Sequence, residues 1–146
     1  MLDRDQWLHY SASMHSVTIQ PEEIFQARAE ETRLRIIRLM VVTSEESCLC
    51  ELVDSLLEPS YKLSRHLKIL RQAGLLSSKK EGRWVYHRLL TEPPYLESLY
   101  AMVRALPDSN KIYSADLKRF RERMCLREGG RCLIGIQSGA FKAEAK

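Results

Sequence analysis

The chain has 146 residues and a formal net charge of +4, with 45% hydrophobic and 29% charged residues. This length and balance predict one folded, soluble domain and exclude a disordered or fibrous chain. The sequence has no apolar run long enough to cross a membrane, and its acidic first residues lack a secretory apolar core, so we expect a cytoplasmic protein without membrane contact. Its 4 cysteines are then expected as free thiols, metal ligands or redox groups rather than disulfides.

Helical signals begin after residues 1–20, which show no clear period and are predicted to form an N-terminal arm. Pro21, followed by two acidic residues, predicts the start of a first helix. Apolar residues at i, i+3 and i+7 predict a second helix over about 31–42. A third helix is expected over about 47–57, with Ser47 as its candidate N-cap.

A proline break separates the third helix from the elements that follow. Pro59 cannot continue a helix, so a fourth helix is expected over about 60–73, with a leucine stripe on one face and cations on the others. Two strands, 75–80 and 83–89, then flank the two-residue loop Glu81-Gly82, which suits a tight hairpin turn.

Two more helices complete the predicted fold, one over about 95–106 and one over about 114–127, which Gly129-Gly130 ends before a loose tail. The fold class is therefore mainly α, a winged helix-turn-helix with a two-stranded β-hairpin wing. The expected division is an N-terminal arm at 1–20, a winged helix-turn-helix domain for DNA binding and dimerisation at 21–106, and a C-terminal helix with a flexible tail at 107–146.

The order of two helices, a short break, a basic helix and a hairpin with a cationic tip is typical of a DNA-binding unit. A helix fits the major groove, where base edges carry a distinct donor and acceptor pattern, and hairpin cations meet phosphates or the minor groove. The predicted DNA contacts are Tyr61, Lys62, Ser64, Arg65 and His66 on the fourth helix, with Lys79, Lys80 and Arg83 on the hairpin. The alternative is that these charges only form a solvated helix surface, which applies most to Lys68 and Arg71.

No enzyme motif competes with this interpretation. The sequence has no phosphate-binding glycine loop, no His-Glu metal-hydrolase spacing and no nucleophile elbow, so we predict a protein that is not an enzyme and has no obligatory cofactor. A thiol enzyme stays open, because sequence does not exclude a cysteine oriented by a base. The basic helix and hairpin tip disfavour a winged helix that binds only proteins.

His87 is expected on a strand surface, His9 and His15 in the solvated arm, and Trp7 and Trp84 in packing positions.

Three segments of the chain resemble the ArsR family of metalloregulatory repressors. They read ETRLRI at 31–36, SRHLKILRQAGLL at 64–76 and EGRWVYHRL at 81–89, and the resemblance covers about 24–106. It implies a homodimeric winged-helix repressor that binds an inverted-repeat DNA operator and leaves it when an inducer binds. It also implies dimerisation through the first helix and the helix at about 95–106. The apolar face expected to be covered in that dimer consists of Leu96, Leu99, Tyr100 and Val103.

Two cysteines stand at the expected start of the third helix. Cys48 and Cys50 offer soft thiolates, and a helix N-terminus lowers the pKa of a thiol. Their run, CLCEL, is similar to the Cys-Val-Cys-Asp-Leu motif of arsenite- and antimonite-responsive members of the family, which implies trivalent arsenic or antimony as the inducer. Where those members often have a third cysteine, this chain has Val53. The third thiol is then predicted to be Cys132 rather than Cys125, which we expect to be a small buried hydrophobic residue.

The spacing of these two cysteines suggests a mechanism of release. Residues two apart do not face the same way on a regular helix. Cys48 and Cys50 can therefore hold one ion only where the first helical turn unwinds or never forms. Because this helix supports the basic helix that follows it, ion capture is expected to move the DNA-reading element.

Three other roles stay open for the cysteines: buried structural thiols, a thiol-redox switch, or ligands of cadmium or lead. The i, i+2 spacing differs from the Cys-x-x-Cys of thioredoxin-like sites. Cadmium sensors of the family draw extra thiols from the N-terminal arm, which here has none. Zinc sensors of the family use Asp and His on the helix after the hairpin, and this helix has neither.

Overall fold

The structure is a computed structural model that describes residues 30–137. The predicted arm, the helix expected at Pro21, the residues His9, His15 and Trp7, and the last residues of the tail lie outside that range. The described part of the chain folds in the order α3, β1, α4, α5, β2, β3, α6 and α7. No helix in this part is long and apolar enough to cross a membrane.

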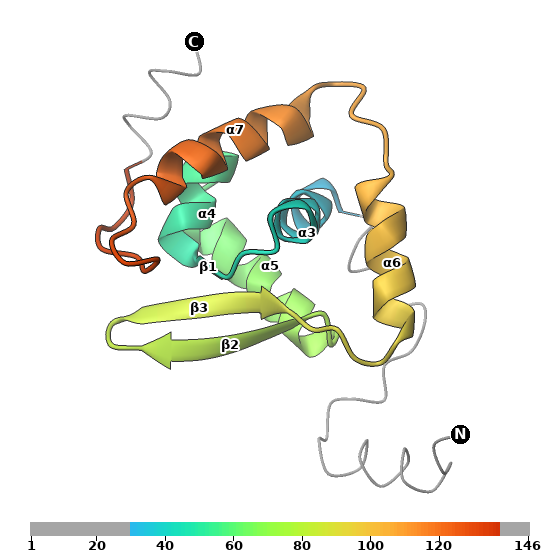
Figure 1. Cartoon of the computed structure of the whole chain (residues 1–146), viewed down its shortest axis with the longest axis horizontal. Coiled ribbons are helices and arrows are strands. Elements are labelled where there is room, and N and C mark those ends of the chain that lie inside the picture. The colour runs from blue at the N-terminus through green and yellow to red at the C-terminus, as the bar shows by residue number, and fades with distance from the viewer. Residues whose placement is uncertain (1–29, 138–146) are drawn as a thin grey trace, which may run out of the picture.

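The helix-turn-helix lies where the sequence predicts it (Figure 1). α3 (Glu31–Thr43) is followed by α4 (Leu49–Leu56) and α5 (Ser60–Gln72). α4 ends where Leu57 takes a left-handed conformation with φ of 54°, and Pro59 stands just before α5. With the hairpin that follows, this order confirms the mainly α, winged helix-turn-helix class.

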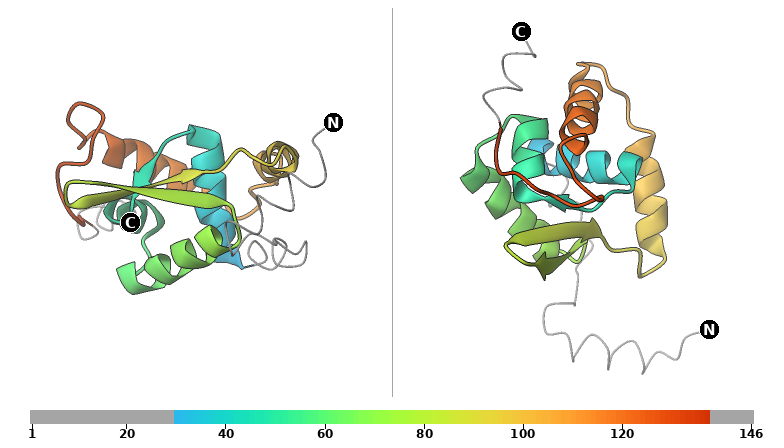
Figure 2. Two further views of the ribbon diagram at one scale, coloured as in Figure 1. Left: turned by 90° about the horizontal axis from the view of Figure 1, so that it is seen from below. Right: turned by 60° about the vertical axis from the view of Figure 1, so that its left-hand side comes forward.

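The wing is a hairpin of β2 (Leu76–Glu81) and β3 (Trp84–Leu89), which extends alongside α5 (Figure 2). The predicted turn is one residue out of place. Glu81 pairs with Trp84, so the turn residues are Gly82 and Arg83 rather than Glu81 and Gly82. Gly82 has φ of +61°, which glycine adopts without strain at the first position of such a turn.

The sheet has a third strand that no pattern in the sequence predicts. β1 (Ser47–Cys48) pairs antiparallel with β3, giving the strand order β1-β3-β2. Ser47 lies opposite His87 and Cys48 lies opposite Tyr86. Ser47 is therefore a strand residue, and the N-cap of α4 is Cys48 instead. A strand of 2 residues is too short to show alternation, which is why sequence patterning does not reveal it.

Two helices cover the helix-turn-helix. α6 (Tyr95–Arg104) packs on α3, and α7 (Ile112–Met124) lies across α4 on the side of the molecule away from the hairpin (Figure 1). The face of α6 expected to be covered by a second copy is buried in the chain's own core. Leu96, Tyr100 and Val103 all belong to that core, and Leu99 is partly buried against it. Most of the face expected to be free for a dimer is therefore covered by the chain itself.

The C-terminal segment, residues 125–137, folds back on α4 and is not the loose tail that was predicted. α7 ends at Met124, short of the predicted end at about 127. Gly129-Gly130, both with positive φ, form a turn within the segment rather than the end of the helix. The backbone N–H of Gln137 donates to Asp54 Oδ1 of α4 at 2.7 Å, which fixes the far end of the segment.

Two clusters of buried hydrophobic side chains form inside the described chain. The larger one is a hydrophobic core to which all five helices contribute. The smaller one contains Cys48, Cys50, Tyr86 and Cys132, with Trp84 packed against it. Trp84 is therefore a packing residue, as predicted, and the smaller cluster gathers the residues with the most reactive chemistry.

Candidate functional site

Cys48 and Cys50 lie on either side of the start of α4. Cys48 is extended, with φ of −84° and ψ of 159°, and pairs with Tyr86 across β1 and β3, whereas Cys50 belongs to the first turn of the helix. The i, i+2 spacing requires that the first helical turn either unwinds or never forms around the two cysteines. The second condition is met, because no helical turn forms at Cys48. Both side chains belong to the same buried cluster while α4 stays intact.

Cys132 reaches the same place from the C-terminal segment. Its Sγ lies 3.4 Å from Cys50 Sγ, and its backbone N–H donates to Tyr86 Oη at 2.8 Å. Cys125 is exposed, and its thiol donates to the carbonyl of Arg121, so the expectation that Cys125 is buried is wrong. We call the three buried cysteines, Cys48, Cys50 and Cys132, the thiol cluster.

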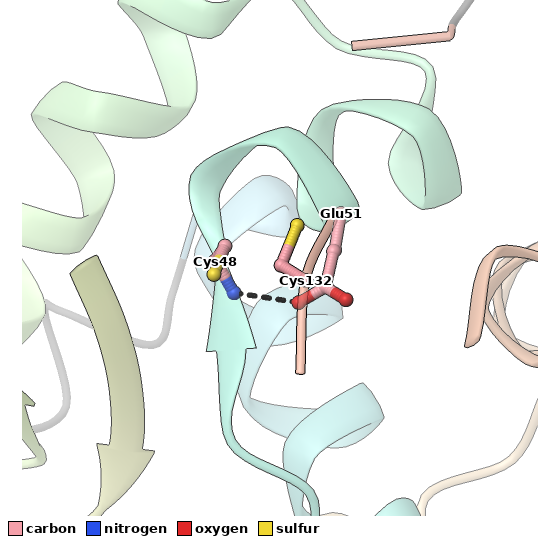
Figure 3. A group of neighbouring side chains, drawn as sticks. All are labelled: Cys48, Glu51 and Cys132. Carbon is pink, nitrogen blue, oxygen red and sulfur yellow. Dashed lines mark hydrogen bonds between the residues drawn. The ribbon is translucent and has the colours of Figure 1, made fainter. Parts of the chain in front are cut away.

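A buried carboxylate borders the thiol cluster (Figure 3). Glu51, in the first turn of α4, has an oxygen within 4.8 Å of the Sγ atoms of Cys48 and Cys132. Its Oε1 accepts hydrogen bonds from the Cys48 N–H at 2.9 Å and from Arg127 Nη2 at 2.8 Å. Its Oε2 accepts from Arg127 Nε at 2.6 Å. Glu51 is 0% exposed, and a carboxylate so buried keeps its charge only with partners of this kind.

A second buried ion pair joins α7 to α4 and to the C-terminal segment. Arg123 Nε lies 2.6 Å from Asp54 Oδ2, and both side chains are 0% exposed. Arg123 Nη2 also donates to the carbonyls of Ile134 at 2.7 Å and Gly135 at 3.0 Å. The charges beside the thiol cluster therefore cancel in pairs, Arg123 with Asp54 and Arg127 with Glu51.

The three thiols have different proton affinities. The hydrogen bond from Cys48, reinforced by Cys132 and the charge of Arg123 and opposed by burial, lowers the pKa of Cys50 to about 6. The same hydrogen bond, together with burial, raises the pKa of Cys48. Burial, together with the hydrogen bond to Cys50, raises the pKa of Cys132 to about 11. Of the three thiols, that of Cys50 therefore loses its proton most easily, and thiolates are the ligands that soft metals and metalloids prefer.

The C-terminal segment also contacts the wing. The guanidinium of Arg131 pairs with Glu81 of β2 at 3.0 Å. Arg83, at the tip of the hairpin, donates from Nη2 to the carbonyl of Leu133 at 3.4 Å. Because Cys132 lies between Arg131 and Leu133 in the chain, the third thiol sits on the stretch of backbone that touches the wing.

The predicted DNA contacts occupy exposed positions on α5 and on the wing, with two exceptions. The exposed side chains are Tyr61, Ser64, Arg65, Lys79, Lys80 and Arg83. Lys62 is half-buried and pairs with Glu58 at 3.1 Å. The pairing with Glu58 leaves Lys62 less available to a phosphate than the exposed cations.

His66 is the second exception. It is 2% exposed on the inner side of α5, its Nδ1 accepts a hydrogen bond from Arg33 Nε at 3.1 Å, and its Nε2 lies 3.2 Å from Glu30 Oε2. Burial, opposed by the charge of Glu30, lowers the pKa of His66. A side chain turned toward α3 does not reach a base edge, so the expectation that His66 contacts DNA is corrected to a packing role between α5 and α3.

His87 is buried rather than on the strand surface. It is 4% exposed, and burial, with a smaller effect from the charge of Arg71, lowers its pKa to about 4. Among the described residues, neither His87 Nδ1 nor the hydroxyl of its cross-strand neighbour Ser47 has a hydrogen-bond partner. Successive strand residues face opposite ways, so His87 points away from the face that carries Tyr86 and the thiol cluster.

Sequence reasoning missed the charged residues that frame the cluster. Arg123 pairs with Asp54, 69 positions away, and Arg127 pairs with Glu51, 76 positions away. The only signal was the four-residue spacing of the two arginines, which would place them on one side of a continuous helix, although α7 ends at Met124, before Arg127. That spacing indicates a shared surface and does not identify the partners.

Comparisons with known proteins relate the chain to bacterial regulators. A family model described as "Bacterial regulatory protein, arsR family" matches residues 30–78. The arsenic resistance transcriptional regulator ArsR1 of Pseudomonas putida is 37% identical over 105 residues, which cover 71% of this chain and 80% of that protein. The arsenical resistance operon repressor of Escherichia coli is 42% identical over 74 residues, covering 51% of this chain and 62% of that protein. The transcriptional repressor SmtB of Mycobacterium tuberculosis is 38% identical over 74 residues, which cover 47% of this chain and 55% of that protein.

Proposed function

We propose, from the premise that this chain belongs to the ArsR family of DNA-binding transcriptional repressors, that its inducer is trivalent arsenic or antimony. The observation that carries the proposal is the 3.4 Å separation of Cys50 Sγ and Cys132 Sγ, with Cys48 in the same buried cluster. Similarity to relatives named as arsenic resistance regulators supports the same ion. The family is one of regulators, which agrees with a role other than catalysis.

Three thiolates suit a soft trivalent ion. Thiolate ligands select soft ions, and an ion of charge +3 with three thiolates makes a neutral complex. Neutrality matters here because the ion would be buried among charges that already cancel in pairs. A cadmium or lead site of four thiolates would also need Cys125, whose exposed thiol donates to the carbonyl of Arg121 in α7.

Release of DNA follows from where the three thiols are attached. Cys48 and Cys50 belong to the start of α4, the helix that precedes the recognition helix α5. Cys132 belongs to the segment that contacts the wing through Arg131 and Leu133. An ion that draws the three sulfur atoms onto itself therefore changes the position of the wing relative to α5, and both must fit the same DNA duplex.

The proposed DNA contacts are the exposed residues of α5 and the wing. Arg65 and Ser64, early in α5, are placed to meet base edges in the major groove, with Tyr61 beside them. Lys79, Lys80 and Arg83 are placed to meet phosphates or the minor groove. Lys62 is proposed as a weaker contact, because Glu58 competes for its charge.

A homodimer on an inverted-repeat operator is proposed on the basis of family membership. The dimer contact on α6 would use side chains outside the chain's own core, including the exposed Tyr95 and Met102. Sedimentation of the full chain at micromolar concentration is expected to give a dimer, and a monomer that still binds a two-half-site operator contradicts this part of the proposal.

The function is tested by a gel shift with an operator selected from randomised duplexes by the purified protein under reducing conditions. Arsenite or antimonite is expected to abolish the shifted band, and the selected sequence is expected to be an inverted repeat. Cadmium, zinc and hydrogen peroxide are tested in parallel lanes. Release by cadmium or by peroxide, with none by arsenite or antimonite, would replace the proposed inducer with a divalent metal or an oxidant.

A further inference from the structure

We propose that Arg127 determines the ion selectivity of the thiol cluster by preventing the carboxylate of Glu51 from acting as a fourth ligand. The inference rests on the proposed function in one respect, that Cys48, Cys50 and Cys132 bind the ion. Arg127 is then a positioning residue, because it touches Glu51 rather than the ion.

Glu51 is placed beside two of the three thiols, where its carboxylate could add a further ligand to the ion. One of its oxygens lies within 4.8 Å of the Sγ atoms of Cys48 and Cys132 (Figure 3). Carboxylate oxygens bind zinc alongside thiolates, and sites for that ion are almost always four-coordinate. By composition alone, three cysteines and one glutamate would therefore suit a divalent metal as well as a trivalent metalloid.

Arg127 occupies both oxygens of that carboxylate. Its Nε and Nη2 donate to Oε2 and Oε1 at 2.6 and 2.8 Å, the bidentate geometry in which arginine binds carboxylates most strongly. Oε1 also accepts the Cys48 N–H at 2.9 Å. The same Nη2 donates to the carbonyl of Glu46 at 2.6 Å, and the Arg127 side chain is 7% exposed, so the guanidinium is itself held in place.

The two kinds of ion respond differently to this arrangement. Three thiolates complete the ligand set of trivalent arsenic or antimony, which needs nothing from Glu51. A divalent ion on three thiolates lacks its fourth ligand while Arg127 holds the carboxylate. Arg123 does not have the same effect, because it pairs with Asp54, which is outside the group of ligand atoms near the thiols.

The experiment compares cadmium binding by the full-length protein and its variants R127Q, R127K, E51Q and R127Q/E51Q, using competition with a chromophoric chelator. Glutamine cannot neutralise Glu51, so R127Q is expected to bind Cd²⁺ about 10–100-fold more tightly than the parent, the usual size of an outer-shell effect on metal affinity. R127K keeps the positive charge but loses the bidentate contact, so a smaller gain is expected. The gain should disappear in R127Q/E51Q, and E51Q alone should bind Cd²⁺ as weakly as the parent.

Two results would overturn the inference. One is equal Cd²⁺ affinity in the parent and in both Arg127 variants. R127K decides the question if R127Q does not fold, because it retains a cation beside the buried carboxylate. The other is a gain in R127Q that persists in R127Q/E51Q, since Glu51 would then not be the added ligand. X-ray absorption of the parent with arsenite tests the proposed function separately: absence of As–S bonds contradicts that function, whereas the cadmium series still reports on Arg127.

Discussion

The Sγ atoms of Cys50 and Cys132 lie 3.4 Å apart, although the two residues are separated by 82 positions in the chain. Cys132 is held there by its own backbone, through the hydrogen bond to Tyr86 Oη at 2.8 Å. Arg123 fixes the residues that follow, because it donates to the carbonyls of Ile134 and Gly135. The third thiol is thus positioned by contacts that do not involve an ion.

Replacing Cys132 with serine is expected to lower the number of sulfur ligands around bound arsenic from three to two. The serine hydroxyl is a harder donor than a thiolate, so the arsenite concentration needed for DNA release should rise. Arsenic X-ray absorption measures the sulfur coordination, and an arsenite titration of the protein–DNA complex measures the response. C125S is the matched control, because Cys125 is exposed and should have no effect. Equal effects of the two substitutions would argue against Cys132 as a ligand.

Arg65→Ala is expected to weaken operator binding by about 1–3 kcal/mol and to relax the preference for one base, if Arg65 makes a base contact of ordinary strength. Arg65 is exposed in the first half of α5. K68A is the control, since Lys68 is an exposed cation in the second half of the same helix. Binding is measured by fluorescence anisotropy with the selected operator and with single-base variants. Uniform loss across all sequences would make Arg65 a phosphate contact instead.

His66→Ala is expected to lower the free energy of unfolding by about 1–3 kcal/mol, because it removes a buried hydrogen-bond partner of Arg33 and leaves unfilled volume between α5 and α3. Denaturant unfolding measures this loss. R65A, one position earlier and exposed, should change stability by no more than about 0.5 kcal/mol. Base preference at the operator should be the same for the parent and H66A. A change in base preference without a change in stability would show that His66 contacts DNA.

The adjacent residues Arg65 and His66 show what the sequence can and cannot predict. The order of helices, the hairpin and the Cys48–Cys50 pair depend on local signals, such as a proline break, helical periodicity and adjacent thiols. The burial of His66 depends on its contact with α3, and His87 lies opposite Ser47 of β1 in the sheet. No local pattern in the sequence predicts either neighbour. β1 itself is too short to recognise, yet it holds Cys48 out of the helix. The closeness of Cys132 to Cys50 requires the turn at Gly129-Gly130, which local analysis placed at a helix end.

His87 is expected to make the protein less stable as the pH falls from about 6.5 to 4. Burial lowers its pKa in the folded protein to about 4, whereas in the unfolded chain it titrates near 6.5. Between these values the unfolded state binds more protons, so the free energy of unfolding rises with pH in this window. The loss between pH 7 and pH 4.5 attributable to His87 is about 2 kcal/mol. Denaturant unfolding of the parent and H87Q at both pH values measures it. An equal pH dependence in the two proteins would contradict burial of His87 as a neutral side chain.

The most direct measurement is operator release during an arsenite titration, followed by fluorescence anisotropy, for the parent and for the C48S/C50S variant. Both cysteines lie on α4 and β1, away from the exposed residues of α5 and the wing, so the variant is expected to bind the operator with the parent's affinity before arsenite is added. Arsenite should then release the parent and leave the variant bound. Release of C48S/C50S at the same arsenite concentration as the parent would contradict the account, because the ion would then act without two of the three thiols.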